Sequence, residues 1–381
     1  MPTKESKPNL SHSQVTETVK RLYGLTASVI RPLPSYDDQN FYVAPSEGGE
    51  YVLKVMNSAD SHNITVIELQ THAMNFLNQR GLPAQTALPT LTGQLMSLEE
   101  FDCGFGLQKY LVRLLTYLPG TTVAKITCSP QILYDVGKMA ATLDTVLLQM
   151  EHPNISVLQR EDFIWNLASV PLLKQYIHVM DGDPVQTVVK AVLEQYQIQV
   201  VPKLPLFRKC KMSFSFRCQH FYVSVFFFRR FYCIAGINHG DFNDHNLLVK
   251  PNGPTKYKIS GILDFGDMSC GYFIFELAIT IMYMMIENPN PVDVGGPVVA
   301  GWESVFPLNE AERDSLYLLV LCRFCQSLVL ARHAVTQQPE NEEYLMITSK
   351  TGVRHLCHLW ELGKEEVERK WFQSAAQFGQ P

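Results

Sequence analysis

Two short polar loops, each joined to an apolar run, most restrict what this chain of 381 residues can fold into. The first loop lies in "INHGDFNDHNLLV", where His239 and Asp241 precede Asn246. The second lies in "KISGILDFGD" and begins at Asp264, eighteen positions after Asn246. The apolar runs beside both loops are typical of short β-strands. The sequence therefore predicts two small β-pieces that each carry a polar loop, set between long helices.

These loops contain the residue types that phosphoryl transfer needs. One carboxylate must orient and deprotonate a substrate hydroxyl, while an amide oxygen and a second carboxylate must hold the magnesium ion that neutralises the phosphates. Either loop alone is a weak signal, because Asp-Phe-Gly often occurs by chance. Both loops in this order, downstream of the strand-like "YVLKV" with Lys54, form a strong prediction. Taken alone, Lys54 would be read as an edge-strand lysine, and the two downstream loops reverse that reading.

The order of the expected elements predicts an α+β fold with two lobes. A helix ending at Gly24, a three-stranded meander, a helix ending at Gly81 and two strands near 93–98 and 109–118 form a small N-terminal lobe. We expect residues 1–112 to form this lobe, 113–120 to be the hinge, and 121–381 to form a larger, mainly helical lobe. Its predicted helices are Pro130–Leu148, Pro184–Val201, Phe273–Ile286, Glu310–Ala334 and Glu342–Glu368.

The chain resembles the aminoglycoside phosphotransferase and choline kinase branch of the protein-kinase-like fold. Within that branch, "RPLPSYDDQNF", "YLVRLLTYLPG", "NHGDFNDHN", "GILDFGDMS" and "AITIMYMMIE" resemble the hydroxylysine kinase family. The resemblance implies a small antiparallel-sheet N-lobe, a larger helical C-lobe, and transfer of phosphate from GTP to the 5-hydroxyl of 5-hydroxy-L-lysine. It also implies that Asp241 is the catalytic base and that Asn246 and Asp264 bind Mg²⁺. The residues themselves do not identify GTP as the phosphate donor, so ATP remains an alternative donor.

The expected nucleotide site includes Lys54 and Leu115, with Glu68 as a carboxylate that could fix Lys54. A solvated helix face is the alternative for Glu68. The sequence lacks the G-x-G-x-x-G loop of protein kinases, and the turn that begins at Ser35 takes its place. A short polar turn can still offer backbone N–H groups and a hydroxyl to phosphates. Ser35 therefore joins the nucleotide-binding candidates.

Acidic residues are expected in the acceptor site, because hydroxylysine carries two ammonium groups. The candidates for these groups are Asp38, Asp244, Asp267 and Glu276, and Arg113 is the candidate for the carboxylate. A turn with both of its aspartates in water is the alternative for Asp38. Two other functions stay open: a kinase for another amino alcohol, such as choline or an aminoglycoside, and an inactive kinase-fold binding protein. Intact Lys54, Asp241, Asn246 and Asp264 argue against the inactive protein.

The amino-acid composition restricts the class of protein and the cellular compartment that we expect. A formal net charge of −5 gives no support for nucleic-acid binding, and 46% hydrophobic with 18% charged residues is an ordinary globular balance. The apolar run that contains Glu276 reads as a buried helix rather than a membrane span. Nine cysteines and a start without an apolar signal core favour reduced thiols in the cytoplasm. Cys322 and Cys325 are expected to pack in a core, and no oligomeric state is predicted.

Residues 211–236 do not fit the rest of the sequence. The segment contains no acidic residue and is rich in Phe, Tyr, Ser, Val and Cys, which a pyrimidine-rich stretch of RNA would encode. Cys210-Lys211 can be written TGT-AAG, which contains a splice donor, and Ala235-Gly236 can be written GCA-GGT, which contains an acceptor. Removal between these points restores a cysteine codon in frame and gives "LFRKC-INHGDFNDHN". We therefore expect an aberrant insert, with a hydrophobic strand or docking insert as the alternative.

Overall fold

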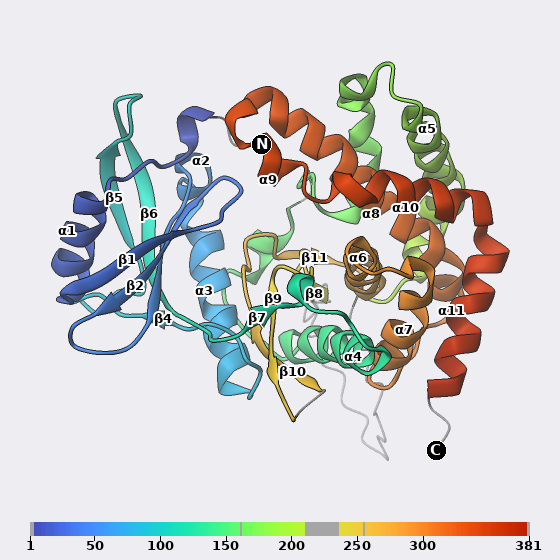
Figure 1. Ribbon diagram of the computed structural model, residues 1–381, viewed down its shortest axis with the longest axis horizontal. Helices are drawn as coiled ribbons and strands as arrows, with labels where there is room; N and C mark the ends of the chain where they lie inside the picture. The colour runs from blue at the N-terminus through green and yellow to red at the C-terminus, as the bar shows by residue number, and fades with distance from the viewer. Residues whose placement is uncertain (1–3, 161, 210–235, 254–255, 379–381) are drawn as a thin grey trace, which may run out of the picture.

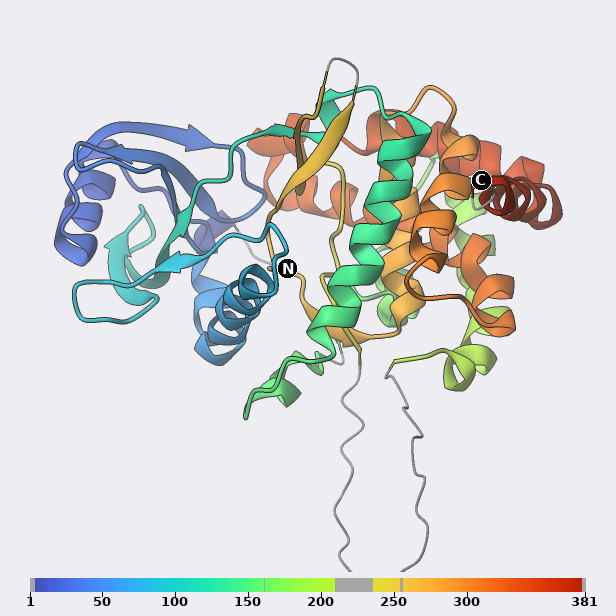
Figure 2. The same ribbon diagram turned by 90° about the horizontal axis from the view of Figure 1, so that it is seen from below.

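The computed structural model describes residues 4–160, 162–209, 236–253 and 256–378. In this part of the chain, a lobe built on an antiparallel sheet lies beside a larger helical lobe (Figures 1 and 2). This arrangement confirms the predicted α+β class with a small sheet lobe and a larger, mainly helical lobe. The predicted insert at 211–236 lies outside the described residues, except for Gly236.

The N-lobe sheet has six strands in the order β1-β2-β3-β6-β4, and β5 pairs with β6. The strands are β1 (Ala27–Leu33), β2 (Gln39–Pro45), β3 (Tyr51–Val55), β4 (Ala87–Leu88), β5 (Ser97–Asp102) and β6 (Leu107–Thr116). The predicted meander is thus formed by β1, β2 and β3. In the register of the sheet, Lys54 on β3 lies between Asn40 on β2 and Arg113 on β6.

Three helices accompany this sheet: α1 (His12–Tyr23), α2 (Ser58–Ser61) and α3 (Ile64–Gln79). A capping box formed by Ser11 and Gln14 begins α1, and Gly24 ends it in the left-handed conformation that the sequence predicts. On α3 the apolar residues Ile67, Met74 and Leu77 are all buried.

Helices dominate the C-lobe. Those predicted best are α4 (Pro130–Leu147), α6 (Phe273–Ile286) and α8 (Glu310–Gln337). The expected helix at 184–201 is α5 (Val185–Gln195) followed by a wider π-helical turn, Tyr196–Val200. A further helix, α7 (Gly295–Glu303), was not predicted, since its glycines and proline hide the helical pattern.

The helix predicted at 342–368 is wrong as a single element. The structure divides the region into α9 (Glu342–Leu345), α10 (Ser349–Leu362) and α11 (Lys364–Phe378). Gly363 separates the last two helices with a φ of 77°, which a side chain would strain. The break lets α11 change direction and pack against α7.

Four short strands carry the two polar loops. The predicted β-pieces are β8 (Gly236–Asn238), β9 (Leu247–Pro251) and β10 (Tyr257–Ile262), and β11 (Ser269–Gly271) pairs with β8. Strand β9 pairs with β10 and also with β7 (Thr121–Thr122). The loop 239–246 therefore connects β8 to β9, and the loop 263–268 connects β10 to β11.

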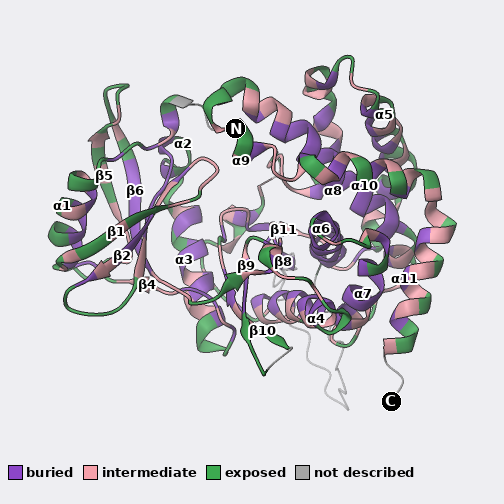
Figure 3. Cartoon of the chain, in the orientation of Figure 1, coloured by how far each residue is buried: buried purple, intermediate pink, exposed green. Residues whose placement is uncertain are grey.

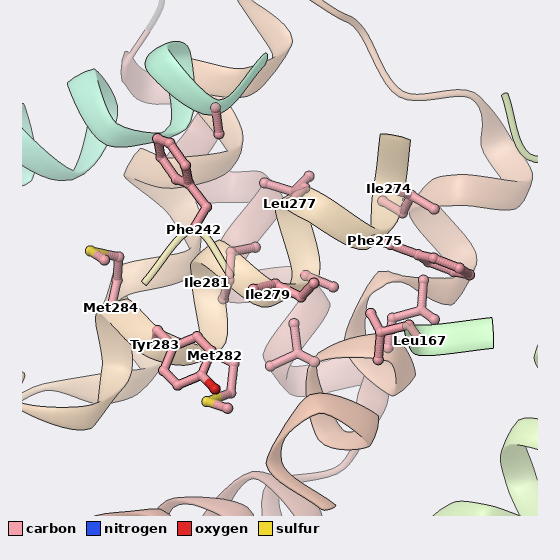
Figure 4. Packing of buried hydrophobic residues seen from close by; sticks show 14 of the residues in the cluster. Leu167, Phe242, Ile274, Phe275, Leu277, Ile279, Ile281, Met282, Tyr283 and Met284 are labelled. Carbon is pink, nitrogen blue, oxygen red and sulfur yellow. The ribbon is translucent and has the colours of Figure 1, made fainter. Parts of the chain in front are cut away.

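The core of the C-lobe surrounds α6, of which all fourteen residues are buried (Figure 3). Its side chains pack together with Phe242 of the first polar loop (Figure 4). Among the described residues, only α8 is long and apolar enough to cross a membrane, but 83% of its apolar window is buried in the protein. Cys322 and Cys325 are among those buried residues and are free thiols, as expected for core packing.

The predicted hinge begins too early. Strand β6 continues through Thr116, so residues 113–116 belong to the N-lobe sheet. The next strand, β7, begins at Thr121 and pairs with β9 in the C-lobe. The connection between the lobes is therefore 117–120, because the paired backbone of β6 keeps the preceding residues within the sheet.

The described residues on either side of the predicted insert both lie against Phe273. The carbonyl oxygen of Arg208 accepts a hydrogen bond of 3.1 Å from the Phe273 amide. A Cβ placed on Gly236 would lie 2.6 Å from the Phe273 ring. Since the two flanks converge on one residue, a direct connection between them needs little rearrangement.

We expect a protein that lacks residues 211–236 to fold and to be the more soluble and more active form, because an apolar stretch without an acidic residue favours aggregation unless it is buried. Sequencing transcripts across Phe207–Asp241 and comparing solubility, thermal unfolding and activity of the two forms test this. A major message that retains the segment, together with a soluble and active long form, would contradict it.

Candidate active site

Buried polar contacts hold the first polar loop, residues 239–246, in place. Gly240 has a φ of 82°, and a Cβ there would lie 2.5 Å from the carbonyl oxygen of Asp267, so only glycine fits. The Gly240 amide donates to Glu276 of α6 at 3.1 Å. His239 is fully buried, accepts from the Asp241 amide through Nδ1 at 3.3 Å, and its Nε2 lies 2.9 Å from the Leu263 carbonyl.

His239 is therefore a structural residue. An Nδ1 that accepts and an Nε2 that donates describe a neutral imidazole. Burial lowers the pKa of His239 below its ordinary value, in spite of the nearby Asp241 carboxylate. The ring joins the first loop to the second through Leu263 and needs no proton exchange to do so.

The Asp241 carboxylate, predicted as the base, is fixed on both oxygens. Its Oδ2 accepts from the side-chain amides of Asn243 at 2.8 Å and Asn246 at 2.9 Å. Its Oδ1 lies 3.1 Å from the guanidinium of Arg323. The Asp241 side chain is 25% exposed, whereas that of Arg323 is 1% exposed. The carboxylate thus faces solvent on one side and is oriented by buried donors on the other.

Sequence reasoning missed Arg323 and Asn243. Arg323 lies in the apolar helix α8, where its guanidinium packs over the rings of Trp165 and Tyr283 and donates to the Trp165 carbonyl. A buried arginine within an apolar helix is the signal that could have identified it, because such a charge needs a partner. Trp165 contributes here through its ring and backbone.

Lys54 is buried and pairs with two carboxylates. Its Nζ lies 2.9 Å from Asp38 and 3.2 Å from Asp264. Burial by itself would lower the pKa of Lys54, but Asp264 and Asp38 raise it above its ordinary value. Asp38 is in turn held by the backbone and side-chain amides of Asn57. The lysine is therefore a fixed cation directed at the second polar loop.

The predicted pairing of Lys54 with Glu68 does not form. Glu68 is exposed on α3, and Asp38 supplies the buried carboxylate instead. Two residues further along α3, the buried Gln70 donates to the carbonyl of Gly266 at 3.0 Å. The helix therefore contacts the second loop through an amide, because its inward face presents Gln70 rather than Glu68.

The structure also places the other residues that the sequence predicted for the nucleotide and acceptor sites. Arg113 is 1% exposed and donates to Thr71 at 2.9 Å, so it lies inside the N-lobe and cannot reach a substrate carboxylate there. Asp38 is committed to Lys54 and is not open to a substrate ammonium. Leu115 is buried on β6 within the larger hydrophobic cluster, and Ser35 is half-buried in the turn between β1 and β2.

Two acidic candidates form no ion pair with any residue that the structure describes. Asp244 is 4% exposed, and its Oδ2 has no hydrogen-bond partner among the described residues. Burial raises its pKa to about 7. The Asp267 carboxylate is half-buried and accepts no hydrogen bond from any residue that the structure describes. Burial and then the Asp241 carboxylate raise the pKa of Asp267 to about 8, although Arg323 and Arg160 oppose this.

Arg160 supports the backbone that carries Asp267. Its Nη1 donates to the carbonyls of Gly266 at 3.0 Å and Met268 at 3.3 Å, and its guanidinium stacks on Phe163. The Gly266 carbonyl thus accepts from Arg160 in the C-lobe and from Gln70 in the N-lobe. This shared acceptor fixes the second loop between the two lobes.

Asn246 and Asp264 present oxygen atoms that fit Mg²⁺. The side-chain nitrogen of Asn246 is used by Asp241, which leaves its Oδ1 for a ligand. The Asp264 side chain is 44% exposed, and Asp264 has a φ of 51°, the one positive φ outside glycine in the described chain. Burial would raise the pKa of Asp264, but Lys54 outweighs it and lowers the pKa. An ionised carboxylate and an amide oxygen are the protein ligands that a nucleotide-bound Mg²⁺ needs.

Comparison with known proteins decides the family. The model of the phosphotransferase enzyme family matches residues 29–197 and 233–308, more than half of the chain. The chain belongs to the phosphotransferase enzyme family. This membership confirms the predicted enzyme class, a phosphotransferase with an alcohol group as acceptor. The family match leaves out 198–232, which contains most of the predicted insert.

Individual relatives are similar over their whole length. The chain is 80% identical over 380 residues to the hydroxylysine kinase of Danio rerio, with 100% of both chains covered. It is 48% identical over 381 residues to the hydroxylysine kinase of Xenopus laevis, with 97% of this chain and 95% of the relative covered. The predicted resemblance is therefore confirmed.

Solved structures of other kinases share the fold. A microcompartment-associated aminopropanol kinase aligns with a TM-score of 0.63 at 16% identity, over 96% of this chain and 99% of its own. Amicoumacin kinase in complex with AMP-PNP, Ca²⁺ and Ami aligns with a TM-score of 0.62 at 15% identity, over 90% and 95%. These alignments confirm the predicted kinase-like fold, and the roles of Asp241, Asn246 and Asp264 stay predictions.

Proposed function

We propose that this phosphotransferase moves the terminal phosphate of GTP to the 5-hydroxyl of 5-hydroxy-L-lysine. The observation that carries the proposal is the 80% identity, over both full lengths, to the hydroxylysine kinase of Danio rerio. The unpaired Asp267 carboxylate near Asp241 supports it, because a cationic acceptor needs an acidic group close to the base.

The chemistry follows from the position of Asp241. The acceptor hydroxyl donates its hydrogen bond to the exposed side of the carboxylate, and its oxygen forms a bond to the terminal phosphorus of the nucleotide. The phosphorus–oxygen bond to the leaving nucleoside diphosphate breaks, and the hydroxyl proton passes to Asp241. Arg323, Asn243 and Asn246 hold the carboxylate in place, so that little motion is needed during transfer.

Lys54 and the metal ligands act on the nucleotide side of the cleft. Lys54 offers a buried, permanently charged ammonium for the phosphates. Asn246 and Asp264 would hold Mg²⁺ there. When bound, the ion neutralises phosphate charge and orients the transferred group.

A panel of hydroxy-amines tests the proposal. Purified protein is assayed with 5-hydroxylysine, choline, an aminoglycoside and aminopropanol, each with GTP and with ATP. We expect the highest kcat/KM with 5-hydroxylysine and GTP. A preference for another amino alcohol would assign the protein to that acceptor instead. No turnover of any member by correctly folded protein would leave the inactive binding protein as the remaining function.

Asp267 is the residue that we expect to bind the ammonium nearest the reacting hydroxyl. The two carboxylates of Asp241 and Asp267 repel each other, and a cation between them relieves that repulsion. Replacement by asparagine keeps the shape and removes the charge. We therefore expect Asp267→Asn to raise the KM for 5-hydroxylysine by roughly tenfold to a hundredfold, because a hydrogen bond to a charged group contributes about 1.5–3 kcal/mol.

Asp244→Asn is the matched comparison, because Asp244 is also unpaired but is more deeply buried. Initial rates at varied acceptor and varied nucleotide separate the two KM values. A large rise in acceptor KM for Asp244→Asn with little change for Asp267→Asn would move the ammonium site to Asp244. The KM for the nucleotide should stay within about twofold in both variants, because neither residue faces Lys54.

A further inference from the structure

The segment 160–166 lies along the second polar loop and the strand that follows it. Arg160, at the start of the segment, donates through Nη1 to the carbonyls of the two residues that flank Asp267, at 3.0 and 3.3 Å. Asn166, at its end, donates to the first two residues of β11 at 3.1 Å each. Because both ends of the segment are bound, Arg160 is held against the loop rather than free on the surface.

Asp267 brings Arg160 close to the loop that carries Asp241. A Cβ placed on Gly240, the residue before Asp241, would lie 2.5 Å from the carbonyl oxygen of Asp267 and 3.3 Å from its Cβ. Asp267 therefore contacts the first loop directly, while its two neighbours in the chain accept from Arg160. These contacts place Asp241, Asp267 and Arg160 in one continuous part of the site.

The guanidinium of Arg160 is oriented and keeps donors for a ligand. It lies over the ring of Phe163, 3.5 Å from the centroid, which fixes its plane. Only Nη1 is used by the loop, so Nε and Nη2, which form one edge of the group, donate to no residue that the structure describes. Burial lowers the pKa of Arg160, and the Asp267 carboxylate opposes this shift. A fixed planar cation with one free edge is suited to bind a carboxylate through two parallel hydrogen bonds.

Arg160 and Asp267 present opposite charges that the protein does not use on each other. Neither forms an ion pair with the other or with another residue that the structure describes. The other arginines are committed: Arg113 lies inside the N-lobe, and Arg323 pairs with Asp241. An acceptor that carries both an ammonium and a carboxylate would supply a partner to each of the two unpaired groups.

We propose that Arg160 binds the carboxylate of the acceptor through its Nε and Nη2 edge, beside the ammonium that Asp267 binds. This inference rests on the proposed function, in which the acceptor is a hydroxy amino acid. The hydroxyl at Asp241, the ammonium at Asp267 and the carboxylate at Arg160 are three points of attachment, which a flexible acceptor chain reaches by bending. An amino alcohol without a carboxylate lacks the third point, so Arg160 is a specificity-determining residue. Phe163 is a positioning residue, because it acts through the guanidinium.

The decarboxylated form of 5-hydroxylysine, a diamino alcohol, tests the inference. Initial rates of the whole protein are measured with Mg²⁺, GTP and either acceptor. We expect the wild-type KM to be roughly tenfold to a hundredfold lower for 5-hydroxylysine than for the diamino alcohol, as for a hydrogen-bonded charged pair. Arg160→Gln should remove this preference, because it raises the KM for 5-hydroxylysine and leaves the KM for the diamino alcohol and for GTP within about twofold.

Arg80→Gln is the matched control. The guanidinium of Arg80 also lies over a phenylalanine ring, that of Phe76 at 4.6 Å, but Arg80 is exposed and contacts neither polar loop. We expect this variant to keep the wild-type KM for both acceptors. Arg160→Lys keeps a cation without the planar edge and should retain part of the preference, so it replaces Arg160→Gln if that variant does not fold.

The diamino alcohol also separates acceptor binding from support of the second loop. If Arg160 only supports the loop, both acceptors lose activity equally in the variants, and the inference is overturned. A rise in the KM for GTP alone would assign the free edge to phosphate and would overturn it too. Equal wild-type KM values for the two acceptors would overturn it without any variant.

The wild-type rates distinguish a failure of this inference from a failure of the proposed function. If the protein phosphorylates 5-hydroxylysine and the diamino alcohol equally well, only the inference fails. If it phosphorylates neither, both fail. A preference for 5-hydroxylysine that Arg160→Gln removes and Arg80→Gln keeps supports both.

Discussion

Asp241→Asn should lower kcat by roughly 10²–10⁴, the range expected for the loss of a general base, and leave nucleotide affinity largely intact. Asparagine has the same shape but cannot take the hydroxyl proton. The carboxylate contacts Arg323, Asn243 and Asn246, and Asn246 also donates to the backbone carbonyl of Asp241 at 3.0 Å, a hydrogen bond that the variant keeps. Steady-state rates at saturating acceptor and a direct titration with nucleotide measure the two effects separately.

The control for this variant must separate chemistry from folding. Arg323 is buried and keeps only neutral partners when Asp241 becomes asparagine, so some loss of stability is expected. Thermal unfolding of the variant, beside that of Asp293→Asn, shows whether the protein is folded at the assay temperature. Asp293 is exposed and lies far along the chain from both polar loops. A folded Asp241→Asn protein with near-wild-type kcat would refute the assignment of the base.

Asp264→Ala should abolish the metal dependence of nucleotide binding. Its carboxylate is ionised beside Lys54, is partly exposed, and is the one negatively charged ligand proposed for Mg²⁺. Without it, Asn246 offers only a neutral oxygen, which binds the ion weakly on its own. The protein is titrated with GTP, once in the presence of Mg²⁺ and once in the presence of a chelator. The wild-type protein should give a different GTP affinity in each condition, and the variant should give one weak affinity in both.

The variant retains a fixed lysine, which makes the result easier to interpret. Lys54 keeps its contact with Asp38 at 2.9 Å when Asp264 is removed. Loss of affinity then reflects the metal ligand rather than a displaced lysine. Alanine at a φ of 51° is somewhat strained, so thermal unfolding should accompany the titration, with Asp293→Ala as the control. A preserved gain in affinity on adding Mg²⁺ would contradict the assignment of Asp264.

Local patterns in the sequence were enough for most elements. The helices α1, α4 and α8 begin at side-chain caps that neighbouring residues provide, whereas α6 is a continuous apolar run. The predicted ends of helices and strands are wrong where distant contacts or a glycine determine them. Gly363 divides a helix that periodicity alone would continue, and pairing with β3 and β4 keeps β6 in the sheet through Thr116.

For the site, the sequence by itself singled out Lys54, Asp241, Asn246 and Asp264 as candidates, because the residue types and spacing of one strand and two short loops are local properties. Only the tertiary structure decided their partners. Asp38 rather than Glu68 pairs with Lys54, and Arg323, which the sequence did not single out, pairs with Asp241. The physical reason is that an ion pair forms between the charges that packing buries together, and that depends on how lobes distant in sequence meet.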